Sequence, residues 1–346
     1  MDEAGVLLEL VKAYSPSGRE EPGVRAFLRV AESLGFARAE IDEAGNGIAR
    51  IGSGRPQIVF LGHIDTVEGE LPVRVEGERV YGRGATDAKG ALAAALLAAR
   101  NHAAAGEIVV VAAVGEETDS RGARRLIPTM KPDCLIVGEP SSWSGVTVGY
   151  KGNLSLSLTF EGGRSHLSSP EATTVETALA FLDRFKEFCA ARKGLTPFAS
   201  LTAKVHTINS ARSGGKEVVK VGLNVRLPPG VTAAEVLRFF DENGLAGRYK
   251  VVDSSEAVEV DTRNDVVRGL LAGIRAVGGR PTLVRKSGTS DMNLAVPAWG
   301  CPAAAYGPGD SHLDHTDEES MDVQELRKAV RVLEDAFLFL AEAKPA

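Results

Sequence analysis

Side chains that can hold metal ions or move protons follow four apolar segments of the chain. In chain order they are His63 after residues 58–61, Glu116 and Glu117 after residues 108–114, Glu139 after residues 135–137, and His312 and His315 after residues 303–306. Apolar segments of this length are typical of buried strands, and in open α/β sheets ligand sites gather at the carboxyl ends of the strands. We therefore expect these side chains to converge on one crevice.

Asp87 adds a further carboxylate. It lies in a glycine-rich loop, residues 82–90, which leads into an alanine-rich helix and lacks the Gly-Lys-Ser/Thr ending of a phosphate-binding loop. Taken alone, a histidine after a strand or a glycine loop before a helix is usually structural. Together, histidines and carboxylates supply the nitrogen and oxygen ligands expected for zinc or cobalt at a hydrolytic site.

Strands and helices alternate through the part of the chain that carries these residues. Apolar segments and helical periodicity predict strands at 57–61, 108–114 and 134–137 and helices at 3–13, 21–34, 88–105 and 322–342. Buried strands separated by helices are typical of an α/β fold with a mainly parallel sheet flanked by helices.

The pattern changes near Tyr150. Residues 153–160 alternate between polar and apolar, as a half-exposed strand does, and a long helical pattern and a second alternating segment follow. The simplest architecture is a discontinuous α/β domain, residues 1–151 and 259–346, with a small α+β domain inserted at 152–258.

The overall composition excludes several classes of protein. The chain of 346 residues has a net charge of −6, which argues against a general nucleic-acid binder. No apolar run reaches the ~20 residues that span a bilayer, and the acidic start of the chain is not typical of a signal peptide. Three scattered cysteines indicate no disulfide framework. We therefore expect a cytoplasmic protein with no membrane or nucleic-acid partner.

One segment departs from this acidic balance. Residues 184–220 contain eight basic and two acidic side chains, a net charge of +6 in a chain whose remainder carries −12. A solvated, lysine-rich surface is the ordinary interpretation. The alternative is a docking surface for an acidic partner.

The motifs around the candidate ligands resemble those of one family of enzymes, in the same order. They are G-H-I-D-T-V at 62–67, Y-G-R-G-A-T-D-A-K-G at 81–90, G-E-E-T at 115–118, G-E-P at 138–140, and Y-G-P-G at 306–309 followed by H-T-D-E at 315–318. The chain thereby resembles the dinuclear metallohydrolases that include acetylornithine deacetylase, succinyl-diaminopimelate desuccinylase, glutamate carboxypeptidase and aminoacylase. The resemblance implies a homodimeric amide-bond hydrolase with two divalent metal ions, zinc or else cobalt. In it, residues 152–258 form a lid and dimerisation domain.

The resemblance also implies roles for individual ligands. His63 and Glu139 would hold one metal, Glu117 and His315 would hold the other, and Asp87 would bridge the two. A carboxylate suits the bridging role, because its two oxygens can span metals ~3.5–4 Å apart.

Two further residues are implied to act beside the metals. Asp65 would accept the other ring N–H of His63 and so fix its tautomer. Glu116 would be the general base, which takes a proton from water and delivers it to the leaving amine. The family's last ligand precedes a short x-D-E ending, so we assign that ligand to His315 rather than to His312.

Substrate-binding residues are implied in the lid and in one loop outside it. His166, within G-G-R-S-H-L-S-S-P, would donate a hydrogen bond to the developing oxyanion, either in its own subunit or in the partner subunit. Arg226 would grip a substrate carboxylate, and Gly288 and Thr289 in the S-G-T-S-D loop would bind the same carboxylate. Asn224 stands where the family more often has an acidic residue.

Within the family, two loops carry a narrower resemblance. G-H-I-D-T-V-E-G-E-L-P-V and K-S-G-T-S-D-M-N most resemble enzymes of lysine and arginine biosynthesis that release lysine or ornithine from the terminal glutamate of an acidic amino-group carrier protein. The basic segment 184–220 supports such a substrate independently, because it would attract an acidic protein. A deacylase of small N-acyl amino acids and a dipeptidase or carboxypeptidase remain as alternatives, since they share the catalytic residues.

Overall fold

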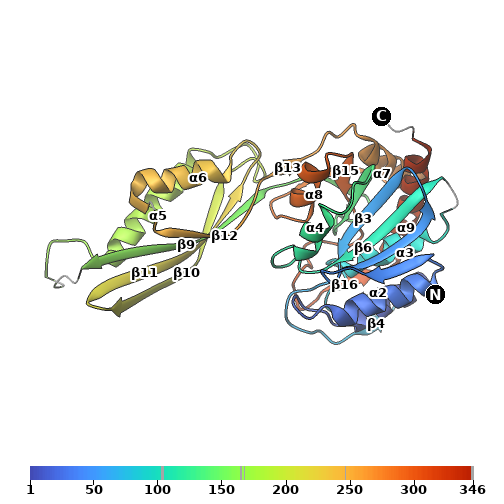
Figure 1. Ribbon diagram of the computed structural model, residues 1–346, viewed down its shortest axis with the longest axis horizontal. Coiled ribbons are helices and arrows are strands. Elements are labelled where there is room, and N and C mark those ends of the chain that lie inside the picture. The colour runs from blue at the N-terminus through green and yellow to red at the C-terminus, as the bar shows by residue number, and fades with distance from the viewer. Residues whose placement is uncertain (103–104, 164–165, 167, 246, 344–346) are drawn as a thin grey trace. The chain divides into compact units, whose positions relative to one another are not determined.

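The computed structural model describes residues 1–102, 105–163, 166, 168–245 and 247–343 (Figure 1). The chain divides into two compact units. Unit 1 comprises Met1–Gly149, Val260–Arg285 and Ser290–Ala346, and unit 2 comprises Tyr150–Glu259 and Lys286–Thr289. The sequence pattern did not indicate that Lys286–Thr289 clusters with the inserted segment. A lid and dimerisation role for unit 2 stays a prediction.

Unit 1 is built on one mixed sheet. Its strands are β1 Arg38–Ile41, β2 Gly47–Ser53, β3 Gln57–His63, β6 Gly106–Ala113, β7 Cys134–Gly138, β8 Gly145–Tyr150, β14 Thr282–Lys286 and β15 Ala303–Ala305. They lie in the order β1-β2-β6-β3-β7-β15-β8, and β14 also pairs with β8. The central strands β6, β3, β7 and β15 are parallel, whereas β1, β2 and β8 pair antiparallel at the edges. A second, small sheet has the order β16-β5-β4, with β4 Arg74–Glu76, β5 Arg79–Tyr81 and β16 Ser320–Asp322.

Five helices share one apolar core with the main sheet: α1 Glu3–Lys12, α2 Glu21–Ser33, α3 Lys89–Ala99, α7 Asp265–Ala276 and α9 Val323–Glu342. Unit 1 also contains α4 Arg121–Leu126 and α8 Met292–Trp299. All residues of α3 are buried, and its many alanines let α1, α9 and the strands β3 and β6 approach it closely. This helix follows the Asp87 loop, so a fully buried helix supports that loop.

The predicted α/β class is confirmed. The strands expected at 57–61, 108–114 and 134–137 are β3, β6 and β7. The helix expected at 88–105 is shorter than predicted, because α3 ends at Ala99. Residues 103 and 104, the end of that prediction, lie outside the described residues. Among the described helices, none combines the length and the apolar character needed to cross a bilayer.

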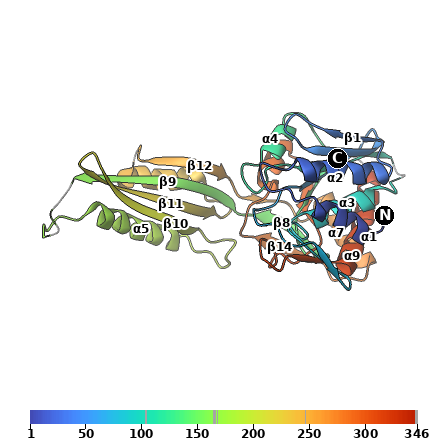
Figure 2. The ribbon, with the colours of Figure 1, turned by 90° about the horizontal axis from the view of Figure 1, so that it is seen from below.

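Unit 2 is an antiparallel sheet with helices on one face. Its elements are β9 Gly152–Gly163, α5 Thr174–Ala190, β10 Thr202–Ser213, β11 Lys216–Leu227, α6 Ala233–Phe240, the turn Asp241–Leu245, β12 Tyr249–Ser255 and β13 Val258–Glu259. The sheet has the order β10-β11-β9-β12. Buried leucines of β9 and valines of β11 form a core with both helices, and Figure 2 shows α5 running along the strands.

The β10–β11 hairpin turns at two glycines. Gly214 and Gly215 have φ of 56° and 80°, a pair of left-handed conformations that two-residue hairpin turns require. The strands pair from Ser213 and Lys216 at the turn to Thr202 and Arg226 at the far end, with one irregularity in β10. The hairpin therefore fixes which residues of β11 face each side of the sheet.

Candidate metal centre

Four neighbouring strands bring the predicted ligands to one edge of the unit 1 sheet. His63 is the last residue of β3, Glu116 and Glu117 follow β6, Glu139 follows β7, and the loop after β15 leads to His315. The strands are parallel and lie in the order β6-β3-β7-β15, so their carboxyl ends meet.

Asp87 lies between two histidines. Its Oδ1 is 3.1 Å from Nε2 of His63, and its Oδ2 is 3.2 Å from Nε2 of His315. Nε2 of His315 is also 3.0 Å from Oε1 of Glu117. Ligand atoms of His63, Asp87 and Glu117 all lie within 4.8 Å of one another. Because the two oxygens of one carboxylate face different imidazoles, this donor set fits a carboxylate that bridges two cations.

The side chains of this cluster shift one another's pKa values. Hydrogen bonds with Asp87 and Glu117 raise the pKa of His315 to about 10. Burial works to raise the pKa of Asp87, but hydrogen bonds from His315 and His63 outweigh it and hold that pKa below its usual value. The carboxylates therefore require positive charge beside them. Protonated imidazoles supply this charge here, and divalent cations would supply it once the imidazoles deprotonate and act as ligands.

Glu116 and Glu139 are two further carboxyl groups near this cluster. Glu139 is buried and Glu116 is half-buried. Burial raises the pKa of Glu116 well above its usual range; the charge of His63 opposes this shift, and the charges of Glu139 and Asp291 add to it. A carboxylate with a raised pKa is a better proton acceptor, as a general base at neutral pH must be.

Asp65 holds the backbone that carries Glu116 and Glu117. Its carboxylate accepts hydrogen bonds from the backbone N–H groups of Glu116 and Glu117, both at 3.1 Å, and from the hydroxyl of Ser17 at 2.7 Å. Nδ1 of His63 is 2.9 Å from the Asp65 carbonyl oxygen and 3.6 Å from its carboxylate. Nδ1 therefore lies nearer to the backbone carbonyl of Asp65, the residue that the sequence predicts as its acceptor, than to the Asp65 carboxylate. Either partner leaves Nε2 facing the cluster.

Two buried residues outside the predicted site, Arg83 and Glu319, join the loops of the cluster. Their Nη1 and Oε2 atoms are 3.0 Å apart. Oε1 of Glu319 accepts hydrogen bonds from the backbone N–H groups of Thr86 and Asp87, both at 3.1 Å. Arg83 also donates to the carbonyl of Thr316, the neighbour of the last ligand, at 2.9 Å. In the sequence, only their positions could have pointed to them: Arg83 lies inside the motif at 81–90, and Glu319 directly follows the motif at 315–318.

Comparison with known proteins places the chain in a family. A family model described as peptidase family M20/M25/M40 matches residues 59–338. This chain belongs to the M20 peptidase family. It is 35% identical over 347 residues to the LysW-lysine hydrolase of Deinococcus radiodurans, with 96% of this chain and 95% of the relative covered. It is 33% identical over 324 residues to the LysW-lysine/LysW-ornithine hydrolase of Sulfurisphaera tokodaii, with 93% and 90% covered.

Solved structures show the same fold. The M20 family metallo-carboxypeptidase Sso-CP2 from Sulfolobus solfataricus matches with a TM-score of 0.76 at 19% identity, and the match covers 99% of both chains. A tripeptidase from Staphylococcus aureus matches with a TM-score of 0.79 at 20% identity and 98% coverage of both chains. As a member of the M20 family, the chain is a hydrolase of amide or peptide bonds, and its cluster is a candidate metal-binding group.

The substrate-binding residues predicted from the M20 motifs all belong to unit 2. Nη1 of Arg226 is 3.3 Å from Oγ1 of Thr289, so the lid arginine and the S-G-T-S-D loop do meet. His166 is exposed, with Nδ1 2.7 Å from Oγ of Ser168. Residues 164, 165 and 167 of its motif lie outside the described residues. Among the described residues, no atom lies within 4 Å of a Cβ built at Gly288.

The M20 assignment of the last ligand can be tested by exchanging His315 and His312 separately for asparagine. His315 has φ of 62°, a conformation that asparagine tolerates, so the backbone should not change. We expect His315→Asn to weaken metal binding by more than about 100-fold, since even the partners of ligands contribute 10–100-fold. His312→Asn should bind metal normally, because within the described part of the chain the exposed His312 side chain has no hydrogen-bonding partner and its backbone N–H donates to Asp310 at 3.0 Å. Metal content after dialysis is measured for both variants. If only His312→Asn lost its metal, the last ligand would be His312 and not His315.

Proposed function

We propose that this protein is a two-metal hydrolase that releases lysine, and also ornithine, from the terminal glutamate of an acidic, LysW-type carrier protein. The observation that carries the two-metal part is the position of Asp87, whose two carboxylate oxygens face different histidines. The carrier substrate is supported by relatives that are named for this reaction and that match the chain over nearly its whole length.

In this proposal the ligand roles follow the two sides of Asp87. His63 and Glu139 hold one ion, Glu117 and His315 hold the other, and zinc is favoured over cobalt. Bound ions of this kind act as Lewis acids and make water more acidic. The chain's own contribution is the proton transfer, because the raised pKa of Glu116 suits it to accept the proton of the attacking water and to return it to the leaving amine.

Unit 2 would supply the groups that recognise the amide. His166 would donate a hydrogen bond to the oxyanion, in its own subunit or across a homodimer. Arg226 would hold the carboxylate of the released amino acid, with Gly288 and Thr289 completing that pocket. The contact between Arg226 and Thr289 supports one shared pocket for these groups. We expect the enzyme in the cytoplasm, because a carrier protein of amino-acid biosynthesis would be found there.

A comparison of substrates tests this function. Purified protein, reconstituted in parallel with zinc and with cobalt, is offered the lysine-loaded carrier, the ornithine-loaded carrier, N-acetyl-lysine, N-acetyl-ornithine and succinyl-diaminopimelate. We expect kcat/KM to be highest for the lysine-loaded carrier. A higher kcat/KM on a small N-acyl amino acid would favour a deacylase. A higher kcat/KM for the cleavage of unmodified dipeptides would favour a dipeptidase.

A further inference from the structure

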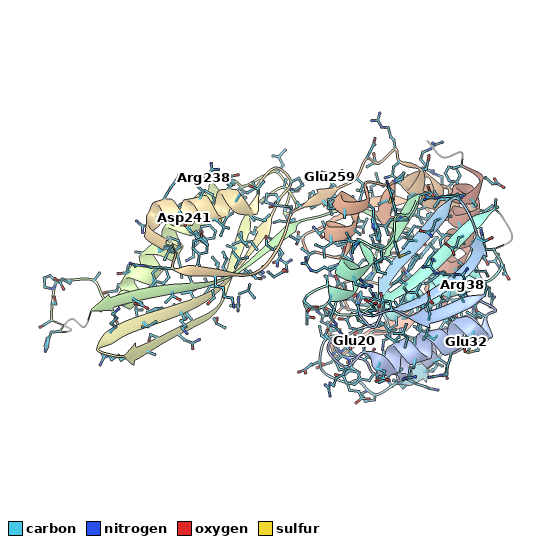
Figure 3. All side chains as sticks on the ribbon, in the orientation of Figure 1. Glu20, Glu32, Arg38, Arg238, Asp241 and Glu259 are labelled. Atoms are coloured by element: carbon cyan, nitrogen blue, oxygen red, sulfur yellow. The ribbon has the colours of Figure 1, made fainter. Side chains whose placement is uncertain are left out.

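The sheet of unit 2 has one face that its helices cover and one face that they do not. Along β9, Leu154, Leu156 and Leu158 are buried in the core with α5 and α6, whereas Ser157 and Thr159 between and beside them are partly exposed. Figure 3 labels Arg238 and Asp241 at the end of α6, on the covered side. The opposite side, called here the open face, is polar and carries no helix among the described residues of unit 2.

Basic side chains gather at one end of the open face. A hollow of about 750 Å³ is lined there by Ser157, Thr159, Glu161, Gly162, Gly163, Lys216, Lys220, Gly247, Arg248, Tyr249 and Lys250. The pairing of β9 with its neighbours puts Lys220 opposite Thr159 and Lys250 opposite Ser157, so both lysines share the open face. Lys216 pairs with Glu161 at 3.2 Å. Within the described part of the chain, Lys220, Arg248 and Lys250 are exposed and make no ion pair.

The structure also divides the basic segment 184–220 that the sequence treats as one surface. Lys216 and Lys220 lie at the hollow, joined by Arg248 and Lys250 from outside the segment. Arg184 and Lys186 lie on α5, which covers the other face of the sheet. Arg192 is already engaged, 2.9 Å from Glu235 and 3.7 Å above the ring of Phe188. Arg184, Lys193 and Arg212 are exposed as well, but they are not among the residues that line the hollow, where Lys220, Arg248 and Lys250 gather.

The open face continues from the hollow to the predicted substrate arginine. Arg226 and Lys220 are both on β11 and, six residues apart, point to the same side of the sheet. At ~3.3 Å per residue they are about 20 Å apart along the strand. Lys204 of β10 pairs with Asn224 between them and is exposed. An extended acidic chain whose end is held at Arg226 would therefore run past Lys204 toward the hollow.

We infer that the open face of unit 2, from Arg226 to the hollow at Lys220 and Lys250, is the surface on which the acidic carrier protein docks. The inference rests on the proposed function for the identity of the occupant. Charge complementarity selects that occupant, because exposed lysines and arginine without ion pairs attract an acidic protein and hold it in one orientation. Such steering weakens as salt screens the charges.

Matched charge reversals on the two faces test this inference. Lys220→Glu/Lys250→Glu alters the open face, and Arg184→Glu/Lys186→Glu makes the same charge change on α5. At low ionic strength we expect the open-face variant to lower kcat/KM for the lysine-loaded carrier roughly 10- to 100-fold, as expected when electrostatic steering is lost. It should leave kcat/KM for N-acetyl-lysine unchanged and respond less to added salt than the wild type. The α5 variant should match the wild type on both substrates.

Three results would overturn the inference. The first is an equal loss of kcat/KM for the carrier in both variants, which would indicate a net-charge effect. The second is an open-face variant whose kcat/KM for the carrier is unchanged. The third is a change of oligomeric state in the open-face variant, which would make this face a contact between copies of the chain. If the double reversal does not fold, Lys220→Ala/Lys250→Ala gives the same comparison with a smaller charge change. Carrier that binds the open face but is not cleaved would contradict the proposed function alone, whereas carrier cleaved equally by both variants would contradict the docking surface alone.

Discussion

Replacement of Glu116 by glutamine should lower kcat about 10²- to 10⁴-fold, the usual contribution of a positioned general base. The amide of glutamine has nearly the same shape but cannot accept the proton of the attacking water at neutral pH. Metal content should be unchanged, because the close contacts of the cluster join His63, Asp87, Glu117 and His315. Steady-state kinetics and metal analysis of the same preparation check the two parts together.

The adjacent residue supplies the control. Glu117→Gln changes the same chemical group one position along the chain, and the Asp65 carboxylate holds both backbone N–H groups at 3.1 Å. Local folding should therefore respond alike in the two variants. Glu117→Gln should lose metal, because it removes a charge 3.0 Å from Nε2 of His315. If Glu116→Gln lost its metal and Glu117→Gln kept it, the base and the ligand would have to be exchanged.

The parts of the fold that the sequence predicts well are those buried on both sides. β3, β6 and β7 are almost entirely buried and contain continuous apolar runs, so their ends, and the residues that follow, can be located without a structure. β10 could not be predicted in this way. Most of its residues are exposed and it lies at the edge of its sheet, so it has neither a continuous apolar run nor a clear alternation. The sequence consequently indicates fewer strands in unit 2 than the structure contains.

Residues that act through the backbone were also hidden from the sequence. The sequence predicts Asp65 as the acceptor for the ring N–H of His63, but not that its carboxylate also holds Ser17 and the backbone after β6. A residue type and its spacing identify which side chains can bind a metal. They do not show which acceptor of an aspartate a neighbour uses, because carbonyl and carboxylate lie within a few ångströms of the same ring.

Arg83 and Glu319 are the strongest case of such hidden support, and their removal should have a large effect. Glu319→Ala leaves the buried Arg83 guanidinium without its carboxylate, which typically costs about 3–5 kcal/mol of unfolding free energy. It also removes the acceptor for the backbone N–H groups of Thr86 and Asp87. Since the pair joins the loops on both sides of the cluster, metal affinity should fall by about 10- to 100-fold.

Glutamine at position 319 separates these two effects. Glu319→Gln keeps a carbonyl oxygen for the backbone of Thr86 and Asp87 but removes the charge beside Arg83, so it should lose stability while retaining most of the metal affinity. Glu319→Ala should lose both, and Glu318→Ala, at the exposed neighbouring position, should lose neither. Denaturant unfolding and metal titration of the three variants measure the two quantities independently. Equal metal affinity in Glu319→Ala and the wild type would show that the Asp87 loop holds its position without Glu319, because the packing of α3 behind it would then be sufficient.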